Sequence, residues 1–371
     1  MMVLPQVDDY PALFLNEIAM IDLRAPQEFE QGSFQSAVNL PLMSDKERKL
    51  VGTCYKEQGQ QQAIALGHEL VTGEVKQQRL QRWLQFIEEN PQGALYCFRG
   101  GLRSQITQRW IYEESGIIYP RVAGGYKKLR RYLIDALEHS IIKMQPTILS
   151  GRTGTGKTLL LKKINNSIDL EGVYHHRGSA FGRHATPQPS QIDVENRLSV
   201  ELLKKCQATA GESPQLLLED EGSNIGSRNL PHSLIERMAA APIVVLDIPL
   251  ERRVGIVFDE YITEALAEYQ QLLGEERGFT TWAENLRQAL GRVKRRLGGE
   301  RYGVLDAVMS GAISDQQQRG EASVHREWIQ RLLNDYYDPM YDYQLQKKAE
   351  RITFRGDEKA VTEYLNTQNI A

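Results

Sequence analysis

The chain has 371 residues, with 45 Lys and Arg against 48 Asp and Glu, so its net charge is -3. At ~150 residues per domain, this length predicts about two or three domains. A composition of 41% hydrophobic and 25% charged residues excludes a disordered or fibrous chain. The longest apolar stretch, around 239–246, is far shorter than the ~20 residues that cross a bilayer, and the first ten residues carry no basic segment. We therefore expect a cytoplasmic protein that does not contact a membrane.

The first part of the chain alternates apolar runs with helical stretches. Ile18–Leu23, Ala94–Phe98 and Gly116–Tyr119 are strand candidates, and Gln77–Glu89 has the pattern of a helix. Strands separated by helices favour an α/β layer with a largely parallel sheet. Lys127–Glu138 has helical periodicity and no helix-breaking residue, so it predicts a closing helix and a first domain over 1–138.

The remainder, 139–371, is predicted to form a second α/β domain with a parallel sheet. Its strand candidates are Pro146–Ser150, Leu216–Leu218, Ile243–Leu246 and, as an edge strand, Arg351–Phe354. Thr158–Ile164 opens a helix. Helical composition from about 252 to 335 predicts an inserted helical subdomain.

Cys97 ends an apolar strand candidate and precedes a glycine-rich loop that contains Arg99 and Arg103. Loop N–H groups and both arginines would stabilise a thiolate, so these three residues are catalytic candidates. The other cysteines, Cys54 and Cys206, are expected to be buried apolar residues, because an odd, widely spaced set predicts neither a disulfide framework nor a zinc site. The Cys-x5-Arg spacing of Cys97 and Arg103 also occurs in phosphatases, which leaves that class as an alternative.

A phosphate-loop pattern, Gly-x4-Gly-Lys-Thr, lies between the strand candidate at 146–150 and the helix that follows. Glycines let the backbone approach a phosphate, the lysine neutralises its charge, and the threonine hydroxyl can bind Mg²⁺. The phosphate-binding candidates are Gly151, Arg152, Thr153, Gly154, Thr155, Gly156, Lys157 and Thr158. Nucleoside triphosphate, a diphosphate ester and a small phosphate donor all satisfy this pattern.

Two further polar groups accompany the phosphate loop. Glu219, Asp220 and Glu221 follow a buried strand, where a second phosphate-loop element would hold metal-bound water. His176, Arg177 and Ser179 belong to a segment suited to an anionic ligand. Adjacent histidines do not share a helical face, so apart from the threonine hydroxyl of the phosphate loop, which can bind Mg²⁺, we assign no residue as a metal ligand.

Several motifs in the first 126 residues resemble the rhodanese family of sulfurtransferases. They are Asp22–Phe29 (Asp-Leu-Arg-Ala-Pro-Gln-Glu-Phe), Gly32, Ala37–Pro41 and Val122–Tyr126 (Val-Ala-Gly-Gly-Tyr). The resemblance implies a rhodanese-like fold in which Cys97 carries a chalcogen as a persulfide or perselenide.

Together with the phosphate loop, the motifs at 176–182 and 337–341 make the whole chain resemble the tRNA 2-selenouridine synthase family. The resemblance implies a rhodanese-like domain followed by a P-loop NTPase-like domain. It implies a transferase that converts wobble 2-thiouridine of tRNA to 2-selenouridine with selenophosphate, through an S-geranyl intermediate made from geranyl diphosphate. In this interpretation the phosphate loop holds the diphosphate, with help from Mg²⁺, and Cys97 handles selenium.

The resemblance also implies partners, which are the anticodon region of a tRNA and an enzyme that supplies selenophosphate. Because the whole chain is slightly acidic, RNA contact must be local. Arg121–Arg131 has five basic and no acidic residues, and Arg287–Arg301 is the stronger candidate. The tRNA-binding candidates are Arg287, Arg292, Lys294, Arg295, Arg296 and Arg301. The alternatives are an ATP-dependent kinase or NTPase with a sulfurtransferase domain, and a non-enzymatic chalcogen carrier.

Overall fold

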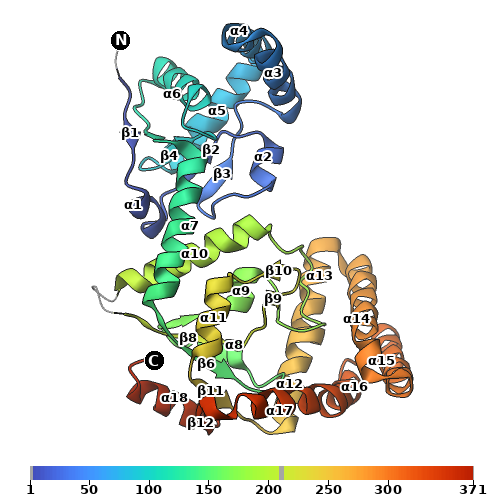
Figure 1. Cartoon of the computed structure of the whole chain (residues 1–371). Helices are drawn as coiled ribbons and strands as arrows, with labels where there is room; N and C mark the ends of the chain where they lie inside the picture. Colours follow the sequence, from blue (N-terminus) through green and yellow to red (C-terminus); the bar gives the residue numbers. More distant parts are fainter. Residues whose placement is uncertain (1–2, 209–212, 371) are drawn as a thin grey trace. The chain divides into compact units, whose positions relative to one another are not determined.

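The computed structural model describes residues 3–208 and 213–370, and the chain divides into two compact units (Figure 1). The N-terminal unit comprises Met1–Ser140 and Ser190–Lys204, and the C-terminal unit comprises Ile141–Pro189 and Lys205–Ala371. The predicted boundary at 138 lies close to the first division. The prediction placed all of 139–371 in one domain, however, whereas 190–204 belong to the N-terminal unit.

The N-terminal unit is built on a parallel sheet with the strand order β1-β5-β4-β2-β3 among the described residues. Its strands are β1 (Gln6–Val7), β2 (Met20–Asp22), β3 (Ala37–Asn39), β4 (Ala94–Tyr96) and β5 (Arg121–Val122). Its helices are α1 (Tyr10–Leu15), α2 (Pro26–Glu30), α3 (Asp45–Gln58), α4 (Gln60–Leu70), α5 (Gly73–Glu89), α6 (Leu102–Ser115) and α7 (Gly125–Lys143). The central strands β2 and β4 are buried along their whole length, which explains their apolar runs.

The strand predicted at Gly116–Tyr119 is wrong. Gly116 ends α6 in the left-handed conformation, with φ of 72°. Ile117 and Ile118 then lie on the surface, 38% and 49% exposed. The next strand, β5, begins only after Pro120, which has no N–H to donate to a neighbouring strand.

Most of helix α10 (Gln191–Ala208) lies in the segment 190–204, which belongs to the N-terminal unit. Asp193 Oδ1 accepts a hydrogen bond from Ser33 N at 2.7 Å, and Ser199 Oγ donates to Leu133 O at 2.7 Å. Its apolar residues Val194, Leu198 and Leu202 are fully buried. An amphipathic pattern reveals that a helix has a buried face, but not which surface covers that face.

The C-terminal unit has a second parallel sheet, with the order β12-β11-β6-β8-β7 among the described residues. Its strands are β6 (Gln145–Ser150), β7 (Ser167–Ile168), β8 (Gln215–Glu219), β11 (Ile243–Leu246) and β12 (Ile352–Gly356). The predicted edge strand near the end of the chain is confirmed as β12. A small antiparallel hairpin joins β9 (Asn224–Ile225) to β10 (Arg228–Asn229).

Helices make up most of the rest of this unit (Figure 1). They are α8 (Lys157–Leu161), α9 (Leu170–Tyr174), α11 (His232–Ala240), α12 (Leu250–Phe258), α13 (Ala265–Leu273), α14 (Glu275–Leu297), α15 (Gly299–Arg319), α16 (His325–Leu332), α17 (Asp338–Lys347) and α18 (Glu358–Thr367), with the π-helical segments η1 (Asp259–Glu264) and η2 (Leu333–Tyr337) and the 3-10 segment η3 (Ala349–Arg351). The helices from α12 to α16 share a core that includes Trp282, Leu290, Met309 and Trp328. None of the described helices combines the length and apolar character needed to cross a bilayer.

Candidate functional site

The phosphate loop leaves the carboxyl end of the central strand β6 and enters α8 at Lys157. Gly151 and Gly154 have φ of 154° and 77°. A Cβ atom on Gly154 would lie 2.6 Å from Val257 Cγ2, and one on Gly151 would lie 2.5 Å from Leu246 O. The loop conformation therefore requires glycine at both positions. Helix α8 ends at Leu161, earlier than the sequence predicted.

Lys157 places a cation inside this loop. Its Nζ donates a hydrogen bond to Gly151 O at 3.2 Å. Burial alone would lower the pKa of Lys157, but Tyr341 and the carboxylates of Glu171, Glu219 and Glu221 raise it above its ordinary value. The ammonium group consequently remains charged at neutral pH.

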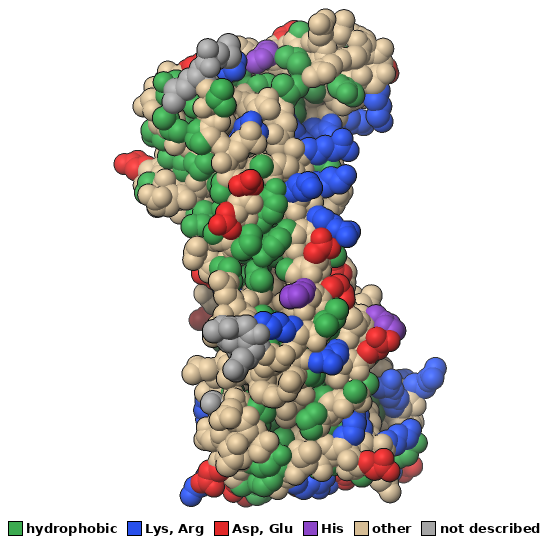
Figure 2. Space-filling view, turned by 60° about the vertical axis from the view of Figure 1, so that its left-hand side comes forward, with side chains coloured by type: hydrophobic (Ala, Val, Ile, Leu, Met, Phe, Trp, Pro, Cys, Tyr) green, Lys and Arg blue, Asp and Glu red, His purple; other side chains and the backbone are tan. Residues whose placement is uncertain are grey.

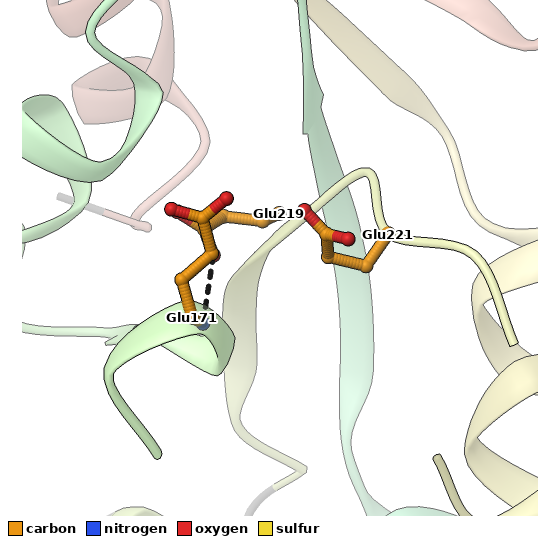
Figure 3. A group of neighbouring side chains, drawn as sticks. All are labelled: Glu171, Glu219 and Glu221. Atoms are coloured by element: carbon orange, nitrogen blue, oxygen red, sulfur yellow. Dashed lines mark hydrogen bonds between the residues drawn. The ribbon is translucent and has the colours of Figure 1, made fainter. Parts of the chain in front are cut away.

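Three glutamates converge beside the phosphate loop (Figure 3). Glu171 comes from α9, Glu219 from the end of β8, and Glu221 from the loop after it, and their carboxylate oxygens lie within 4.8 Å of one another. Thr158 Oγ1 lies 2.7 Å from Glu219 Oε1 and 3.1 Å from Glu171 Oε2. Glu171 N donates to Glu219 Oε2 at 3.2 Å. The carboxylate cluster, as we call these glutamates, is thus joined to the last residue of the loop.

The carboxylate cluster is electrostatically crowded. Burial is the largest cause that raises the pKa values of all three glutamates. Repulsion adds to it, from Glu260 at Glu171 and from Glu171 at Glu219, and repulsion from Glu171 and Glu219 helps to raise the pKa of Glu221 to about 9. A hydroxyl and carboxylate oxygens are the ligands that Mg²⁺ prefers, so this set fits the ion. The sequence predicted that Thr158 can bind Mg²⁺ but predicted none of the three glutamates as a direct ligand. Sequence reasoning missed Glu171 because it lies on a different element from the strand-end acids.

We expect Mg²⁺ to stabilise the protein more at about pH 8.5 than at about pH 6. Carboxyl groups with raised pKa values keep protons in the folded state that the unfolded chain has already lost. Stability without Mg²⁺ therefore falls as the pH rises from the ordinary 4.5 through the folded value, about 9 for Glu221. With Mg²⁺ near 100 times its Kd, the gain of about 2.7 kcal/mol should raise Tm by roughly 5 °C or more. Thermal unfolding at both pH values measures this.

The control for this experiment is Glu221→Gln. Its side chain makes none of the hydrogen bonds described for the cluster, so the change removes a carboxyl group with a raised pKa without removing one of those bonds. It should raise Tm in Mg²⁺-free buffer at the higher pH and reduce the response to Mg²⁺. The same change at the exposed Glu327 should do neither, and an Mg²⁺ response that is independent of pH would contradict the assignment.

Asp220, predicted to act with its two neighbours, does not belong to the carboxylate cluster. Its Oδ2 accepts from Ser150 Oγ and its Oδ1 from Lys348 Nζ, both at 2.6 Å. Successive residues at a strand end point in opposite directions, which separates Asp220 from Glu219 and Glu221. Asp220 therefore serves to hold the segment after α17 against β6.

Helix α17 packs on the phosphate loop through charged side chains. Arg152 makes a bidentate ion pair with Asp342, with two contacts of 2.8 Å. Buried Arg253 contacts Asp338 Oδ1 at 2.7 Å, and Tyr341 places its ring centroid 5.8 Å from Lys157 Nζ. Within the motif at 337–341, for which the sequence analysis named no role, Tyr341 thus contacts the loop and Asp338 binds Arg253 of α12.

His176, Arg177 and Ser179 lie in the same unit but have distinct surroundings. Arg177 Nη2 donates to Glu268 Oε1 at 2.6 Å, and Ser179 Oγ lies 2.6 Å from Tyr261 OH. His176 is buried, and its Nδ1 has no hydrogen-bond partner among the described residues. Two cavities of the C-terminal unit are lined by His176, whereas Arg177 and Ser179 each line one of them.

The predicted basic residues lie on the exposed side of α14 and at the start of α15. Some already have partners in the unit: Arg292 donates to Ala180 O, Arg301 donates to Asp335 O at 3.1 Å, and Lys294 lies over the Tyr302 ring. Arg287, Arg295 and Arg296 are also exposed. In the view of Figure 2, further Lys and Arg side chains gather along one side of the N-terminal unit, so positive charge is not confined to α14.

Cys97 occupies the loop between β4 and α6 in the N-terminal unit. It is 3% exposed, and its Sγ lies 3.4 Å from Ser104 Oγ, which donates to Gly101 O at 2.9 Å. Tyr126 N donates to Cys97 O at 3.0 Å. A Cβ atom on Gly125 would come within 2.1 Å of the same carbonyl, so the predicted closing motif at 122–126 holds the thiol loop in place.

The two arginines near this thiol are arranged differently from each other. Arg103 Nη1 contacts Glu28 Oε2 at 2.7 Å, so a carboxylate already compensates its charge, whereas Arg99 is exposed at the rim of the cavity around Cys97. Arg121, which sequence reasoning did not single out as catalytic, donates to Gly100 O at 3.1 Å. Burial lowers the pKa of Arg121, and the Cys97 sulfur opposes that decrease.

The Asp-x-Arg part of the first motif forms a buried support. Arg24 Nη2 donates to Asp22 Oδ2 at 2.7 Å and to Gly32 O at 2.8 Å, and its guanidinium carbon lies 3.6 Å from the centroid of the Tyr126 ring. Tyr96 OH donates to Asp22 Oδ2 at 2.8 Å. Residues of the early motif are therefore bonded directly to the strand that carries Cys97.

Two neighbouring cavities surround the thiol loop. The cavity of about 770 Å³ at Cys97 is lined by Arg24, Glu28 and Arg99, among others. A groove of about 820 Å³, mostly apolar, lies along α3, α4 and α6 and shares Arg48, Leu102 and Arg103 with the first cavity. One ligand could thus place an anionic group in the cavity near Cys97 and an attached apolar chain in the groove.

Comparison with known proteins decides the family. The family model for the tRNA 2-selenouridine synthase AAA domain matches residues 144–371. The chain is 49% identical to the tRNA 2-selenouridine synthase of Pseudomonas syringae pv. syringae (strain B728a), over 97% of this chain and 98% of that relative. It is 50% identical to that of Marinobacter nauticus (strain ATCC 700491 / DSM 11845 / VT8), over 98% of both chains. The chain belongs to the tRNA 2-selenouridine synthase family.

Membership in the tRNA 2-selenouridine synthase family covers both units. The tRNA 2-selenouridine synthase of Hahella chejuensis (strain KCTC 2396) is 52% identical over 96% of this chain. The AAA domain of this family, 144–371, contains nearly all of the C-terminal unit, with its parallel sheet and phosphate loop, and also the segment 190–204 of the N-terminal unit. The rest of the N-terminal unit, with Cys97, lies outside that domain, and the relatives match this chain over 97% of its length.

Proposed function

We propose that this chain converts 2-thiouridine at the wobble position of tRNA into 2-selenouridine in two transfers, with geranyl diphosphate and selenophosphate as co-substrates. Its relatives carry the name tRNA 2-selenouridine synthase, which supports the overall reaction. The observation that carries the two-step proposal is the pairing of a phosphate loop built around Lys157 with a separate, buried thiol at Cys97.

In the first transfer, the thiocarbonyl sulfur of the nucleoside attacks C1 of geranyl diphosphate. A C–S bond forms, the C–O bond breaks, diphosphate leaves with the electron pair, and the nucleoside loses its N3 proton. The loop N–H groups and Lys157 stabilise the charge that develops on the leaving diphosphate. Thr158, Glu171 and Glu219 would hold Mg²⁺, which supplies further charge compensation to a bound diphosphate.

In the second transfer, selenium adds at C2 and geranylthiolate leaves. S-Geranyl-2-thiouridine, selenophosphate and water give 2-selenouridine, geranylthiol and phosphate, so the overall step needs neither an oxidant nor a reductant. Alkylation is required because a thiocarbonyl sulfur is a poor leaving group. We assign release of selenium to Cys97: its thiolate attacks phosphorus of selenophosphate, an S–P bond forms, the P–Se bond breaks, and hydrogen selenide leaves to attack C2. Water then hydrolyses the S-phosphocysteine to phosphate and the free thiol. Cys97 lies in a rhodanese-like N-terminal unit whose motifs at 22–29 and 122–126 support the thiol loop.

The apolar groove beside Cys97 supports a prenylated intermediate. Its walls include Leu42, Val51, Ile64, Ile106 and Trp110, and it adjoins the cavity that contains the thiol. A ten-carbon chain gains about 0.8 kcal/mol for each buried CH₂ group, which favours placing it in such a groove. The anticodon region of tRNA and an enzyme that produces selenophosphate are the partners of this reaction.

The experiment that tests this function is reconstitution with purified protein. Thiolated anticodon stem–loop RNA is incubated with geranyl diphosphate, with selenophosphate, or with both, and its nucleosides are identified by mass spectrometry. We expect S-geranyl-2-thiouridine with geranyl diphosphate alone, and 2-selenouridine when geranyl diphosphate and selenophosphate are both present. Unmodified RNA in every reaction would refute the proposal, and RNA-stimulated hydrolysis of ATP in parallel samples would favour the kinase or NTPase alternative.

A further inference from the structure

A polar cavity of about 780 Å³ lies in the C-terminal unit, and the steps described above leave it without a ligand. The loop from Gly178 to Gln188, the β9–β10 hairpin and one face of α14 line it. Its volume lies within the ~300–1,000 Å³ range of small-ligand sites. We call it the cationic cavity, because Arg183, Arg228 and Arg292 contribute to its walls.

The positive charge of the cationic cavity is largely uncompensated. None of the ion pairs among residues 3–208 and 213–370 involves its three arginines. Glu284 is the acidic side chain among the lining residues described. Burial, followed by repulsion from cations that include His184, Arg183 and Arg292, lowers the pKa of His176 to about 4. An anionic ligand would relieve this repulsion.

One face of α14 supplies both charge and hydrogen-bonding groups to the cavity. Thr281, Asn285, Gln288 and Arg292 follow one another at spacings of four, three and four residues, so they share one side of the helix. The opposite side, which includes Trp282 and Leu290, is buried in the helical core. An arginine beside amide side chains matches a ligand with both a phosphate and a base edge.

The cationic cavity is connected to the phosphate loop through a shared wall. A neighbouring cavity of about 380 Å³ is lined by Thr158 and Glu171, and both cavities are lined by His176 and His184. The neighbouring cavity is rich in carboxylates, including Asp169, Glu260 and Glu264. The carboxylates of the neighbouring cavity therefore repel a polyanion, whereas the arginines of the cationic cavity attract it. His176 and His184 separate the cationic cavity from the cavity that Thr158 lines.

We propose that the cationic cavity binds one unstacked nucleotide of an RNA loop, with its phosphate held by Arg183 and Arg292 and its base edge contacted by Asn285 and Gln288. A concave pocket accepts a base only when that base is turned out of a stack, which single-stranded loops permit and duplexes do not. The inference rests on the proposed function only for the identity of the polymer as RNA. It assigns Arg292, a predicted tRNA-binding residue, to a defined pocket.

The test measures RNA binding directly, without either co-substrate. Fluorescence anisotropy follows a thiolated anticodon stem–loop RNA over a series of salt concentrations. Arg183→Glu should weaken binding by about tenfold or more and lower the slope of log K against log salt by about one or two. Arg319→Glu, with the same charge change on α15, should leave both quantities within about twofold of the unmodified protein.

Asn285→Ala combined with Gln288→Ala should weaken binding about tenfold but leave the salt slope unchanged, because no charge is removed. With 5-iodouridine placed at each position of the anticodon loop in turn, at least one position should cross-link within residues 176–188 or 281–292. Wild-type affinity in Arg183→Glu and in the amide double variant, or cross-links confined to the N-terminal unit, would overturn the inference. Loss of all turnover with these binding results intact would refute the proposed function and leave the cavity assignment standing.

Discussion

Lys157→Ala should reduce transfer of the geranyl group to RNA by about 10²–10³-fold, the usual effect of removing one preorganised group that stabilises a developing anion. Lys157 is a cation in contact with the loop carbonyl of Gly151, and three carboxylates favour its charged state. Without it, the leaving diphosphate would face the carboxylate cluster with no protein cation between them. Single-turnover kinetics with radiolabelled geranyl diphosphate, together with its Kd, separate loss of chemistry from loss of binding.

Two controls keep this prediction specific. Lys163→Ala removes an exposed lysine just beyond the end of α8, whose ion pair with Glu358 lies on the surface, and should leave the rate within about twofold. Because Lys157→Ala also leaves the glutamates without their cation, thermal unfolding is measured for each variant. A folded Lys157→Ala protein that geranylates RNA at the original rate would refute the assignment of diphosphate to this loop.

Cys97→Ser should abolish formation of 2-selenouridine while S-geranyl-2-thiouridine still accumulates at close to the original rate. The thiol lies in the N-terminal unit, whereas the phosphate loop and its carboxylates belong to the C-terminal unit, so each transfer depends on a different set of side chains. Serine keeps the contact with Ser104 but is a much weaker nucleophile than a thiolate at neutral pH. Mass spectrometry of the RNA nucleosides in the presence of both co-substrates measures the two products together.

The matched control is Cys54→Ser, since Cys54 is also a buried, free cysteine of the N-terminal unit. Both products should form normally in that variant. If Cys97→Ser lost geranylation as well, or if it still produced 2-selenouridine, the proposed division of the two transfers would be wrong.

The sequence predicted best those features that are carried by short, contiguous motifs. The phosphate loop and the Cys97 loop could be located because strand, loop and helix follow one another within a few residues, and β6, β8 and β11 were found from their apolar runs. Contiguous motifs do not predict which side chains from separate helices and strands contact one another. Glu171 joins Glu219 only because α9 lies beside the end of β8, and Asp220 turns away toward Lys348.

The sequence also did not show which acidic side chains pair with Arg103 and Arg152. Arg103 has the spacing of an anion-binding residue, yet Glu28, 75 positions earlier, already contacts it. Likewise, Arg152 of the phosphate loop meets Asp342, 190 positions later. Local patterns identify the charged residue, but its partner is fixed by tertiary packing.

The segment 190–204 has a practical consequence for anyone who wishes to divide this protein. Because Val200 and Leu203 pack against the apolar cluster that contains Leu129 and Leu133 of α7, a fragment cut after Ser140 would expose part of that cluster to solvent. Such a fragment should aggregate on expression. A soluble N-terminal unit would instead require residues 190–204 to be grafted back through an artificial linker, and swapping units between homologues would need three junctions in place of one.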